Sequence, residues 1–312
     1  MKNQVVVLCG PTASGKTALG VLLAKKLCGE VVSADSMQVY RRMNIGTAKP
    51  TPAEMDGVPH HMIDVADPSE DYSVGRYVAD ATRCVDGILS RGKLPILVGG
   101  TGLYLDALVS GTTFAPTDGS RRAALRQKVS QDGLPALYET LSAVDPQRAA
   151  LLAPTDEKRI LRALEVFYET GETITSHDAR TRLLPPRYSA ARLCLFFPEK
   201  TDLWQRIDSR VDTMMALGLL DEVRALQESG VPPNATALQA IGYKEFSAAL
   251  RGEESVEAAQ QVVKLRSRQY AKRQMTWFRR HPDTHFYGWE GTPNFRSALQ
   301  NATTFLADYG IS

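Results

Sequence analysis

One short segment combines residue types that bind phosphate. Residues 10–17 read Gly-Pro-Thr-Ala-Ser-Gly-Lys-Thr and match G-x-x-x-x-G-K-[ST] at every fixed position. Glycines let backbone N–H groups converge on phosphate oxygens, and the N-terminus of a following helix adds positive potential. Lys16 would reach the distal phosphate, and the hydroxyl of Thr17 would bind Mg²⁺. The segment therefore predicts a di- or triphosphate site without saying which one.

A residue that nucleotide hydrolysis needs is missing from the sequence. P-loop ATPases carry an acidic residue at the end of a later strand, where it holds Mg²⁺ and helps to position water. Here the apolar run at residues 94–98 continues directly into Gly-Gly-Thr-Gly at 99–102. Asp106 comes later, in a segment with a helical pattern. This favours a reaction other than ATP hydrolysis.

A carboxylate follows a different apolar run. Asp35 comes two positions after the run at residues 30–33 and begins Asp-Ser-Met-Gln-Val-Tyr. In that place it would face a nucleophile bound opposite the phosphate loop, as the base of a small-molecule kinase does. The alternative is an aspartate that only caps a turn or helix. The polar neighbours Ser36 and Gln38 favour a site, because such groups suit the edge of a nucleobase.

Parallel strands would bring these residues together. Residues 4–9, 30–33 and 94–98 are short apolar runs typical of buried parallel strands, and residues 18–27 have helical spacing. Strands that alternate with helices predict an α/β fold, a P-loop NTPase-like parallel sheet flanked by helices. Ligand-binding residues gather at the carboxyl ends of such strands. The phosphate loop, Asp35 and Thr101 should therefore meet at one edge.

The middle of the chain has a different pattern. Residues 115–119 resemble a linker, residues 121–171 are almost entirely helical in pattern, and residues 183–187 resemble a return linker before a strand at 192–197. We therefore expect a helical insertion at 118–188 within a core domain made of residues 1–117 and 189–312. Residues 202–229 and 256–280 are predicted to be helices of that core.

The chain is almost neutral but has one basic stripe. Its 312 residues are 43% hydrophobic and 23% charged, ordinary values for a globular protein, and 37 Lys and Arg face 35 Asp and Glu. Residues 264–280 nevertheless hold seven cations and no acidic residue, interleaved with Tyr270, Trp277 and Phe278. This pattern suits RNA, since cations neutralise phosphates and aromatic planes stack on bases. A solvated helix face is the alternative, and Trp277 is the first candidate for core packing.

The remaining features exclude several classes of protein. The four cysteines are widely spaced without a C-x-x-C pair, which predicts buried thiols in a reducing compartment. No apolar run is long enough for a signal peptide or a membrane span. We therefore expect a cytoplasmic protein without a membrane partner, and a monomer.

Several motifs in this order carry a family resemblance. They are the phosphate loop, Asp-Ser-Met-Gln-Val-Tyr (35–40), Asn-Ile-Gly-Thr-Ala-Lys-Pro (44–50), Gly-Gly-Thr-Gly-Leu-Tyr (99–104), Leu-Arg-Ala-Leu-Glu-Val-Phe (161–167), Gln-Ala-Ile-Gly-Tyr-Lys (239–244) and Arg-Gln-Tyr-Ala-Lys-Arg-Gln-Met-Thr-Trp-Phe (268–278). Over residues 4–280 the chain resembles the tRNA isopentenyltransferase family, the tRNA dimethylallyltransferases. The chain ends about thirty residues after Trp277 without a Cys/His cluster, so the bacterial type is expected.

The resemblance implies a prenyl transfer to tRNA. The donor would be dimethylallyl diphosphate, and the acceptor would be the exocyclic amine of the adenosine 3′-adjacent to the anticodon. An allylic diphosphate leaves as an anion, which the phosphate loop with Mg²⁺ can stabilise without a hydrolytic carboxylate. The amine is a poor nucleophile that needs a base, and its ring must leave the base stack.

The resemblance also assigns residues. Asp35 would be the general base, and Thr101 would hydrogen-bond the adenine. The diphosphate-binding residues would be Gly10, Pro11, Thr12, Ala13, Ser14, Gly15, Lys16 and Thr17. The helical insertion would contact the anticodon stem. The tRNA-binding residues would be Asp35, Ser36, Met37, Gln38, Lys158, Arg159, Ile160, Leu161, Arg162, Gln239, Ala240, Ile241, Gly242, Tyr243, Lys244, Arg268, Lys272, Arg273 and Gln274.

Two other functions remain open on sequence alone. A P-loop small-molecule or nucleoside kinase would use the same fold, with Asp35 as base and ATP as donor, but it does not need the basic stripe. An RNA-binding module, non-catalytic or driven by ATP, does not need Asp35 and Thr101 beside a phosphate loop. Labelled donor or labelled ATP, incubated with and without tRNA, distinguishes the three.

Overall fold

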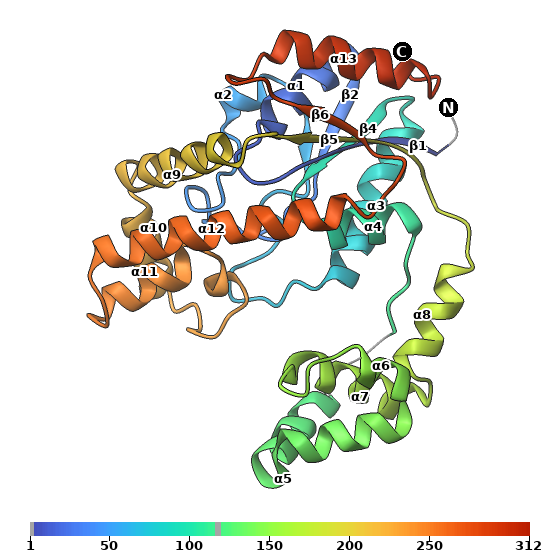
Figure 1. Ribbon diagram of the computed structural model, residues 1–312, viewed down its shortest axis with the longest axis vertical. Coiled ribbons are helices and arrows are strands. Elements are labelled where there is room, and N and C mark those ends of the chain that lie inside the picture. Colours follow the sequence, from blue (N-terminus) through green and yellow to red (C-terminus); the bar gives the residue numbers. More distant parts are fainter. Residues whose placement is uncertain (1–2, 116–119) are drawn as a thin grey trace. The chain divides into compact units, whose positions relative to one another are not determined.

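Six parallel strands form a single sheet in the order β3-β2-β4-β1-β5-β6. The strands are β1 (Gln4–Cys9), β2 (Gly29–Ser33), β3 (His60–His61), β4 (Leu94–Gly99), β5 (Ser189–Phe196) and β6 (His285–Gly288). The computed structural model describes residues 3–115 and 120–312. The predicted α/β class with a parallel sheet is confirmed (Figure 1).

The central strands were predicted and the edge strands were not. β2 and β4 each lie within one residue of the predicted ranges, and β5 begins three residues before the predicted 192. β3 and β6 are two and four residues long, and their side chains are only partly buried or exposed. Such short edge strands carry no continuous apolar run, so sequence periodicity misses them.

The sheet is buried on both faces, which explains its apolar strands. Along β1, Val5 and Val7 belong to one core, while Val6 and Leu8 belong to the other. Helices α1 (Lys16–Lys26) and α13 (Phe295–Ala307) pack in the second core, and α3 (Val74–Ser90) and α4 (Gly102–Ser110) pack in the first (Figure 1).

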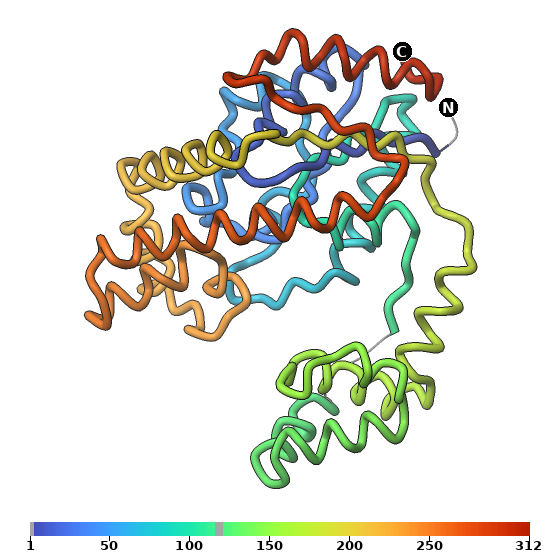
Figure 2. Tube along the Cα trace, viewed as in Figure 1, coloured from blue at the N-terminus to red at the C-terminus, as the bar shows by residue number. Residues whose placement is uncertain are grey.

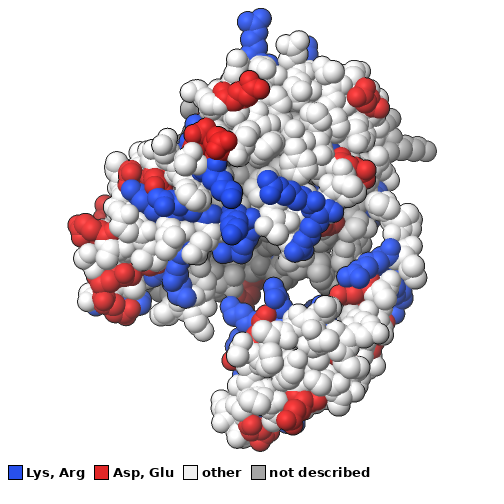
Figure 3. All heavy atoms as spheres, in the orientation of Figure 1, with Lys and Arg blue, Asp and Glu red and all other residues white. Residues whose placement is uncertain are grey.

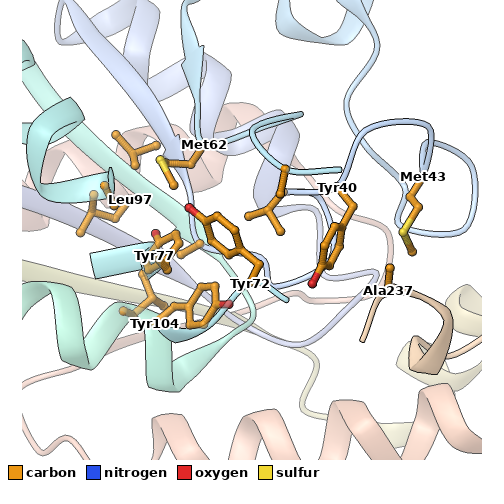
Figure 4. Close-up of a cluster of buried hydrophobic side chains, with 14 of the residues drawn as sticks. Tyr40, Met43, Met62, Tyr72, Tyr77, Leu97, Tyr104 and Ala237 are labelled. Carbon is orange, nitrogen blue, oxygen red and sulfur yellow. The ribbon is translucent and has the colours of Figure 1, made fainter. Parts of the chain in front are cut away.

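Tyrosines are prominent in the first core. Figure 4 shows Tyr40, Tyr72, Tyr77 and Tyr104 among its aliphatic side chains. The rings of Tyr77 and Tyr104 stack with centroids 4.0 Å apart, and the Tyr77 hydroxyl donates to the carbonyl of Ser33 at 3.0 Å. This packing connects α3 and α4 to the end of β2, directly before Asp35.

The C-terminal third adds helices along the site. They are α9 (Lys200–Ala216), α10 (Leu219–Glu228), the 3₁₀ turn η1 (Ala237–Gln239), α11 (Tyr243–Leu250) and α12 (Val256–Phe278). A single helix over residues 202–229 was predicted, but Gly218 with φ of 95° separates α9 from α10. Figure 2 shows the traces of α9 and α12, and side-chain contacts join the two helices.

The helical insertion is a unit with its own core. The chain divides into residues Met1–Val109 with Arg187–Ser312, and residues Ser110–Pro186; the predicted insertion was 118–188. The second unit contains α5 (Ser120–Val144), α6 (Pro146–Ala150), α7 (Glu157–Thr170) and α8 (Ile174–Arg182). Gly133, with φ of 80°, interrupts α5. Of the predicted linker 115–119, residues 116–119 lie outside the described residues.

Candidate active site

The phosphate loop joins β1 to α1, the context that its sequence requires. Gly10 has φ of 144°, and a Cβ there would lie 2.5 Å from the carbonyl oxygen of Leu195. Gly15, with φ of 87°, is the N-cap of α1. Both positions therefore need glycine. Lys16 begins the helix and its Nζ donates to the carbonyl of Pro11 at 2.6 Å across the loop.

Three side chains from the C-terminal third hold the loop. The N–H of Thr12 donates to Oε1 of Gln274 at 2.9 Å. The carbonyl of Ala13 accepts from Nε of Arg206 at 3.1 Å, and that of Ser14 accepts from Nε1 of Trp289 at 2.9 Å. These partners come from α12, α9 and the segment after β6. The sequence pattern indicated none of the three contacts.

A cavity of about 1260 Å³ opens in front of the loop. Thr12, Lys16, Asp35 and Arg210 line it, together with polar side chains of α9. Burial, followed by the positive charge of Arg210, lowers the pKa of Lys16 to about 8, although Asp35 opposes the shift. Burial also lowers the pKa of Arg210. Such a pair of cations favours an anionic ligand.

Arg206 and Arg210 were missed at the sequence level. They lie one turn apart on α9, and Arg210 is half-buried while Arg206 is exposed. An i, i+4 pair of arginines in an amphipathic helix is common on solvated faces, so the spacing alone carried no signal. Only the fold places this side of α9 over the phosphate loop.

Asp35 lies at the turn after β2, as predicted. Its Oδ1 accepts from the N–H of Met37 at 2.8 Å and of Gln38 at 3.3 Å. Oδ2 has no hydrogen-bond partner among residues 3–115 and 120–312, and Asp35 lines the cavity. One carboxylate oxygen of Asp35 thus caps the turn, the role that the alternative interpretation gave it. The other oxygen is available to a ligand in the cavity.

Thr101 is joined to the same turn. Its Oγ1 accepts from the N–H of Ser36 at 3.1 Å, and its own N–H donates to the carbonyl of Ala34 at 3.1 Å. The predicted meeting of the phosphate loop, Asp35 and Thr101 at the carboxyl ends of β1, β2 and β4 is therefore observed. β4 ends at Gly99, and Asp106 lies in α4, where its Oδ2 accepts from Trp277 Nε1 at 2.7 Å.

A second cavity of about 320 Å³ adjoins the first. Thr12, Asp35 and Arg210 line both cavities, as does Tyr270 of α12. Two segments predicted to bind RNA also line the second cavity. They contribute Ser36, Met37, Gln239, Ala240, Ile241 and Gly242. A ligand in each cavity would therefore meet the other beside Asp35.

Gln38 lines the larger cavity but uses its amide within the protein. Oε1 accepts from the hydroxyl of Ser33 at 3.1 Å, and Nε2 donates to the carbonyls of Thr47 and Ala48 at 3.2 Å each. These bonds fix residues 44–50 against β2. The amide supports the cavity wall, and the expected base-edge contact would have to compete with these bonds.

A partly buried network fixes the other side of this wall. The carboxylate of Glu222 in α10 accepts from the N–H groups of Asn44, Ile45 and Gly46 at 2.8–3.1 Å. It also accepts from the hydroxyl of Tyr243 at 2.6 Å. The resemblance implied that Tyr243 contacts RNA, but its side chain is fully buried and therefore not accessible for that contact. Lys244, the next residue, is exposed.

The segment 158–162, predicted to bind RNA, is exposed only in part. The resemblance implied RNA contacts for Ile160 and Leu161, but both side chains are buried in the core of the helical unit and are not accessible for them. Lys158 and Arg159 are exposed on α7. Arg162 donates to Glu165 at 2.9 Å and to the carbonyl of Ala115 at 2.9 Å. Helical periodicity separates these residues onto two faces.

The basic stripe on α12 has acidic partners that lie far away in the sequence. Lys264 pairs with Asp212 at 2.5 Å, Arg266 pairs with Glu245, and Arg268 pairs with Asp208. The lack of acidic residues within the stripe therefore does not leave these cations unpaired, because α9 and α11 supply the carboxylates. The exposed cations without an acidic partner among the described residues are Lys272, Arg273, Arg279 and Arg280. Figure 3 shows Lys and Arg side chains gathered over α9 and α12.

The aromatic residues of α12 have three different environments. Phe278 is buried in the core. Trp277, the predicted core residue, is half-buried and packs against Gly102, where a Cβ would lie 2.2 Å from its ring. Tyr270 lines both cavities. Burial raises the pKa of Tyr270 to about 12, so its hydroxyl stays protonated at neutral pH.

The described residues contain neither a metal-binding cluster nor a membrane-spanning helix. Within residues 3–115 and 120–312, no cluster of three or more His, Cys, Asp or Glu side chains is arranged to hold a metal ion. In the same part of the chain, none of the helices combines the length and apolar character that a membrane span needs.

Comparison with family models identifies two matching regions. The model described as IPP transferase matches residues 38–281, and the model described as isopentenyl transferase matches residues 3–67. A protein of Pelobacter propionicus named tRNA dimethylallyltransferase 1 is 45% identical over 304 residues, which are 97% of each chain. The tRNA dimethylallyltransferase of Geobacillus thermodenitrificans is 43% identical over 311 residues, 98% of this chain and 97% of its own.

Solved structures are similar over the same length. The full-length tRNA isopentenylpyrophosphate transferase of Bacillus halodurans is 41% identical with a TM-score of 0.73, covering 98% of this chain and 96% of its own. A eukaryotic dimethylallyltransferase, crystallised acting on tRNA, is 31% identical with a TM-score of 0.84 over 98% of this chain and 80% of its own.

Proposed function

The chain belongs to the IPP transferase family, and we propose that it is a tRNA dimethylallyltransferase. It transfers a dimethylallyl group from dimethylallyl diphosphate to the exocyclic amine of the adenosine 3′-adjacent to the anticodon. The allylic C–O bond breaks with its electron pair leaving on diphosphate, a C–N bond forms, and the amine loses one proton. The observation that carries this proposal is the convergence of a phosphate loop and a free carboxylate oxygen of Asp35 on one cavity.

The diphosphate side has the charge that the leaving group needs. Lys16 and Arg210 line the cavity with the N–H groups at the start of α1. Preorganised donors and cations stabilise charge that develops in the transition state more than charge in the ground state. Arg206, whose Nε holds the loop through Ala13, keeps these groups in place.

Mg²⁺ fits the oxygen donors of this cavity. The hydroxyl of Thr17 lines the cavity and has no hydrogen-bond partner among the described residues. Hard oxygen ligands, few protein donors and substrate phosphates are the usual environment of Mg²⁺. Thr17 would hold the ion together with diphosphate oxygens and water. When bound, the ion supplies positive charge at the leaving group.

The acceptor side is the second cavity. An adenine that enters it meets Ser36, Met37 and the segment 239–242 on its way to Asp35. Oδ2 of Asp35 accepts the amine proton as the C–N bond forms. Thr101, oriented by the N–H of Ser36, would donate its hydroxyl to the ring. The base must leave its stack to reach this depth, so the enzyme flips it.

The tRNA would bind along exposed cations of both units. The candidates are Lys158, Arg159, Lys244, Lys272 and Arg273, all exposed, with the helical insertion on the anticodon stem. We further propose that the enzyme is a monomer of the cytoplasm, of the bacterial type.

Transfer of label tests this function. Dimethylallyl diphosphate labelled in the prenyl group should label a tRNA that carries adenosine next to the anticodon, with release of one diphosphate. A tRNA with guanosine at that position is the control and should stay unlabelled. Transfer of the γ-phosphate of ATP in place of the prenyl group would favour a kinase. Binding of tRNA without any transfer would favour a non-catalytic RNA-binding protein.

A further inference from the structure

Gln274 has a position that contact with RNA does not explain. Its side chain is 6% exposed although it lies on the cation-bearing helix α12. Oε1 accepts from the N–H of Thr12 at 2.9 Å, and Nε2 donates to the carbonyl of Gly100 at 3.0 Å. One amide therefore joins the phosphate loop to the segment after β4, one residue before Thr101.

The amide of Gln274 is closely packed. A Cβ on Gly100 would lie 2.1 Å from Nε2 of Gln274, so the side chain rests directly on a glycine. Ala271 and Phe278, both buried, anchor α12 on either side of this position. The helix thus has apolar anchors of its own. A buried amide costs free energy unless both of its groups are bonded, and here both are.

We propose that Gln274 is a positioning residue for the transfer reaction, which rests on the function proposed above. It fixes the distance between the phosphate loop, which holds the donor, and the turn of Asp35 and Thr101, which holds the acceptor amine. The two reacting atoms come from different substrates on different loops, and misplacement by about 1 Å costs roughly 10²-fold in rate. Gln274 also lines the larger cavity, and its amide acts on the reaction through its hydrogen bonds to the backbone of Thr12 and Gly100.

The variant Gln274→Met tests this role because it keeps the volume and removes both hydrogen bonds. The matched control is Gln269→Met, the same change at an exposed position of the same helix. We expect the single-turnover rate of prenyl transfer to fall by about 10- to 100-fold in Gln274→Met. The dissociation constants of donor and tRNA, measured separately, should stay within about threefold, since the cations that face the diphosphate, Lys16 and Arg210, are unchanged. Gln269→Met should match the wild type.

Gly100→Ala provides a second, independent measurement. Its methyl group displaces the amide of Gln274, so this variant should lose rate as Gln274→Met does. In a Gln274→Ala background the space is open, and Gly100→Ala should then cost little more. A loss of folded protein would not produce this non-additivity, and the stoichiometry of donor binding in each preparation gives the active fraction.

Three results would overturn the proposal. They are an unchanged single-turnover rate in Gln274→Met, a weakened tRNA affinity with a normal rate at saturation, and strictly additive losses in the double variant. The second result would make Gln274 an RNA contact. A wild-type enzyme that transfers no prenyl group would instead refute the proposed function. An active wild type with any of the three results refutes only the positioning role.

Discussion

Asp35 combines a structural and a chemical role in one carboxylate. Oδ1 caps the turn after β2 through two backbone N–H groups, and Oδ2 faces the cavity. Substitution by alanine would remove both roles, whereas Asp35→Asn keeps an oxygen that accepts from Met37 and Gln38. The asparagine variant is therefore the clean test of the base.

In Asp35→Asn we expect turnover to fall by about 10²–10⁴-fold, the usual range for loss of a general base. The affinity for tRNA should change little, because the turn is preserved. Single-turnover rates and a binding titration measure the two effects. Near-normal turnover would remove Asp35 from the mechanism and leave it as a turn cap.

Lys16 should make donor binding depend on pH. Burial and the charge of Arg210 lower its pKa to about 8 in the free enzyme. Below pH 8 the ammonium is already charged, so the affinity for dimethylallyl diphosphate stays level. Above pH 8 a neutral lysine must take up a proton to pair with the diphosphate, so the affinity falls by about tenfold per pH unit.

Calorimetric titration of the donor between pH 7 and 9.5, without tRNA, measures this dependence. Lys16→Arg is the control, because a guanidinium stays charged throughout the range. Its affinity can be lower overall but should not change between these pH values. The same decline in Lys16→Arg would assign the titration to another group.

Helix α12 has two kinds of cation on one element. Lys264, Arg266 and Arg268 pair with carboxylates of α9 and α11, while Lys272 and Arg273 have none among the described residues. A paired cation is already neutralised locally. We therefore expect phosphate binding mainly at the unpaired end of the helix.

Replacing Lys272 and Arg273 together by alanine should weaken tRNA binding and flatten its salt dependence. Each lost phosphate contact reduces the slope of log affinity against log salt by roughly 0.7–0.9. Donor affinity should hardly change, since the phosphate loop is a separate segment. Binding titrations at several salt concentrations measure both quantities.

The paired cations Lys264 and Arg266 provide the matched control for this experiment. Their double replacement by alanine should leave the salt slope unchanged. Equal slopes in the wild type and in the Lys272/Arg273 variant would mean that this end of α12 is only a solvated face. Loss of donor and tRNA affinity together, with a lower unfolding temperature, would mean that these cations are structural.

The protein as a whole combines a P-loop sheet with a catalytic edge unlike that of an ATPase. β4 ends at Gly99 and is followed by glycines and Thr101, and Asp106 lies in α4 bonded to Trp277 and His281. Within the described residues, the end of β4 thus carries no carboxylate beside the loop, and the carboxylate that lines the cavity, Asp35, follows β2 instead. The cavity is arranged for a leaving diphosphate and a separate nucleophile.

We therefore expect negligible ATP hydrolysis, with or without tRNA. Phosphate release measured beside prenyl transfer under the same conditions tests this expectation. Phosphate release at a rate comparable to prenyl transfer, in the presence of tRNA, would mean that the protein is an RNA-stimulated ATPase and not a prenyltransferase.

Local patterns were sufficient for the phosphate loop, the central strands and the turn of Asp35. Each of these depends on neighbouring residues: glycines that allow positive φ, apolar runs buried on two faces, and a side chain that caps its own turn. The meeting of the three loops followed as well, because parallel strands place their carboxyl ends at one edge.

Contacts between distant segments could not be predicted in the same way. Asp208 and Glu245 neutralise cations of α12, Arg210 enters the cavity from α9, and Gln274 of α12 accepts a hydrogen bond from the phosphate loop. In a helix, residues only one or two positions apart face in different directions, so a contiguous motif divides between core, cavity and solvent. Which face meets which neighbour depends on how the helices pack on the sheet, and that packing is decided by the burial of the whole chain.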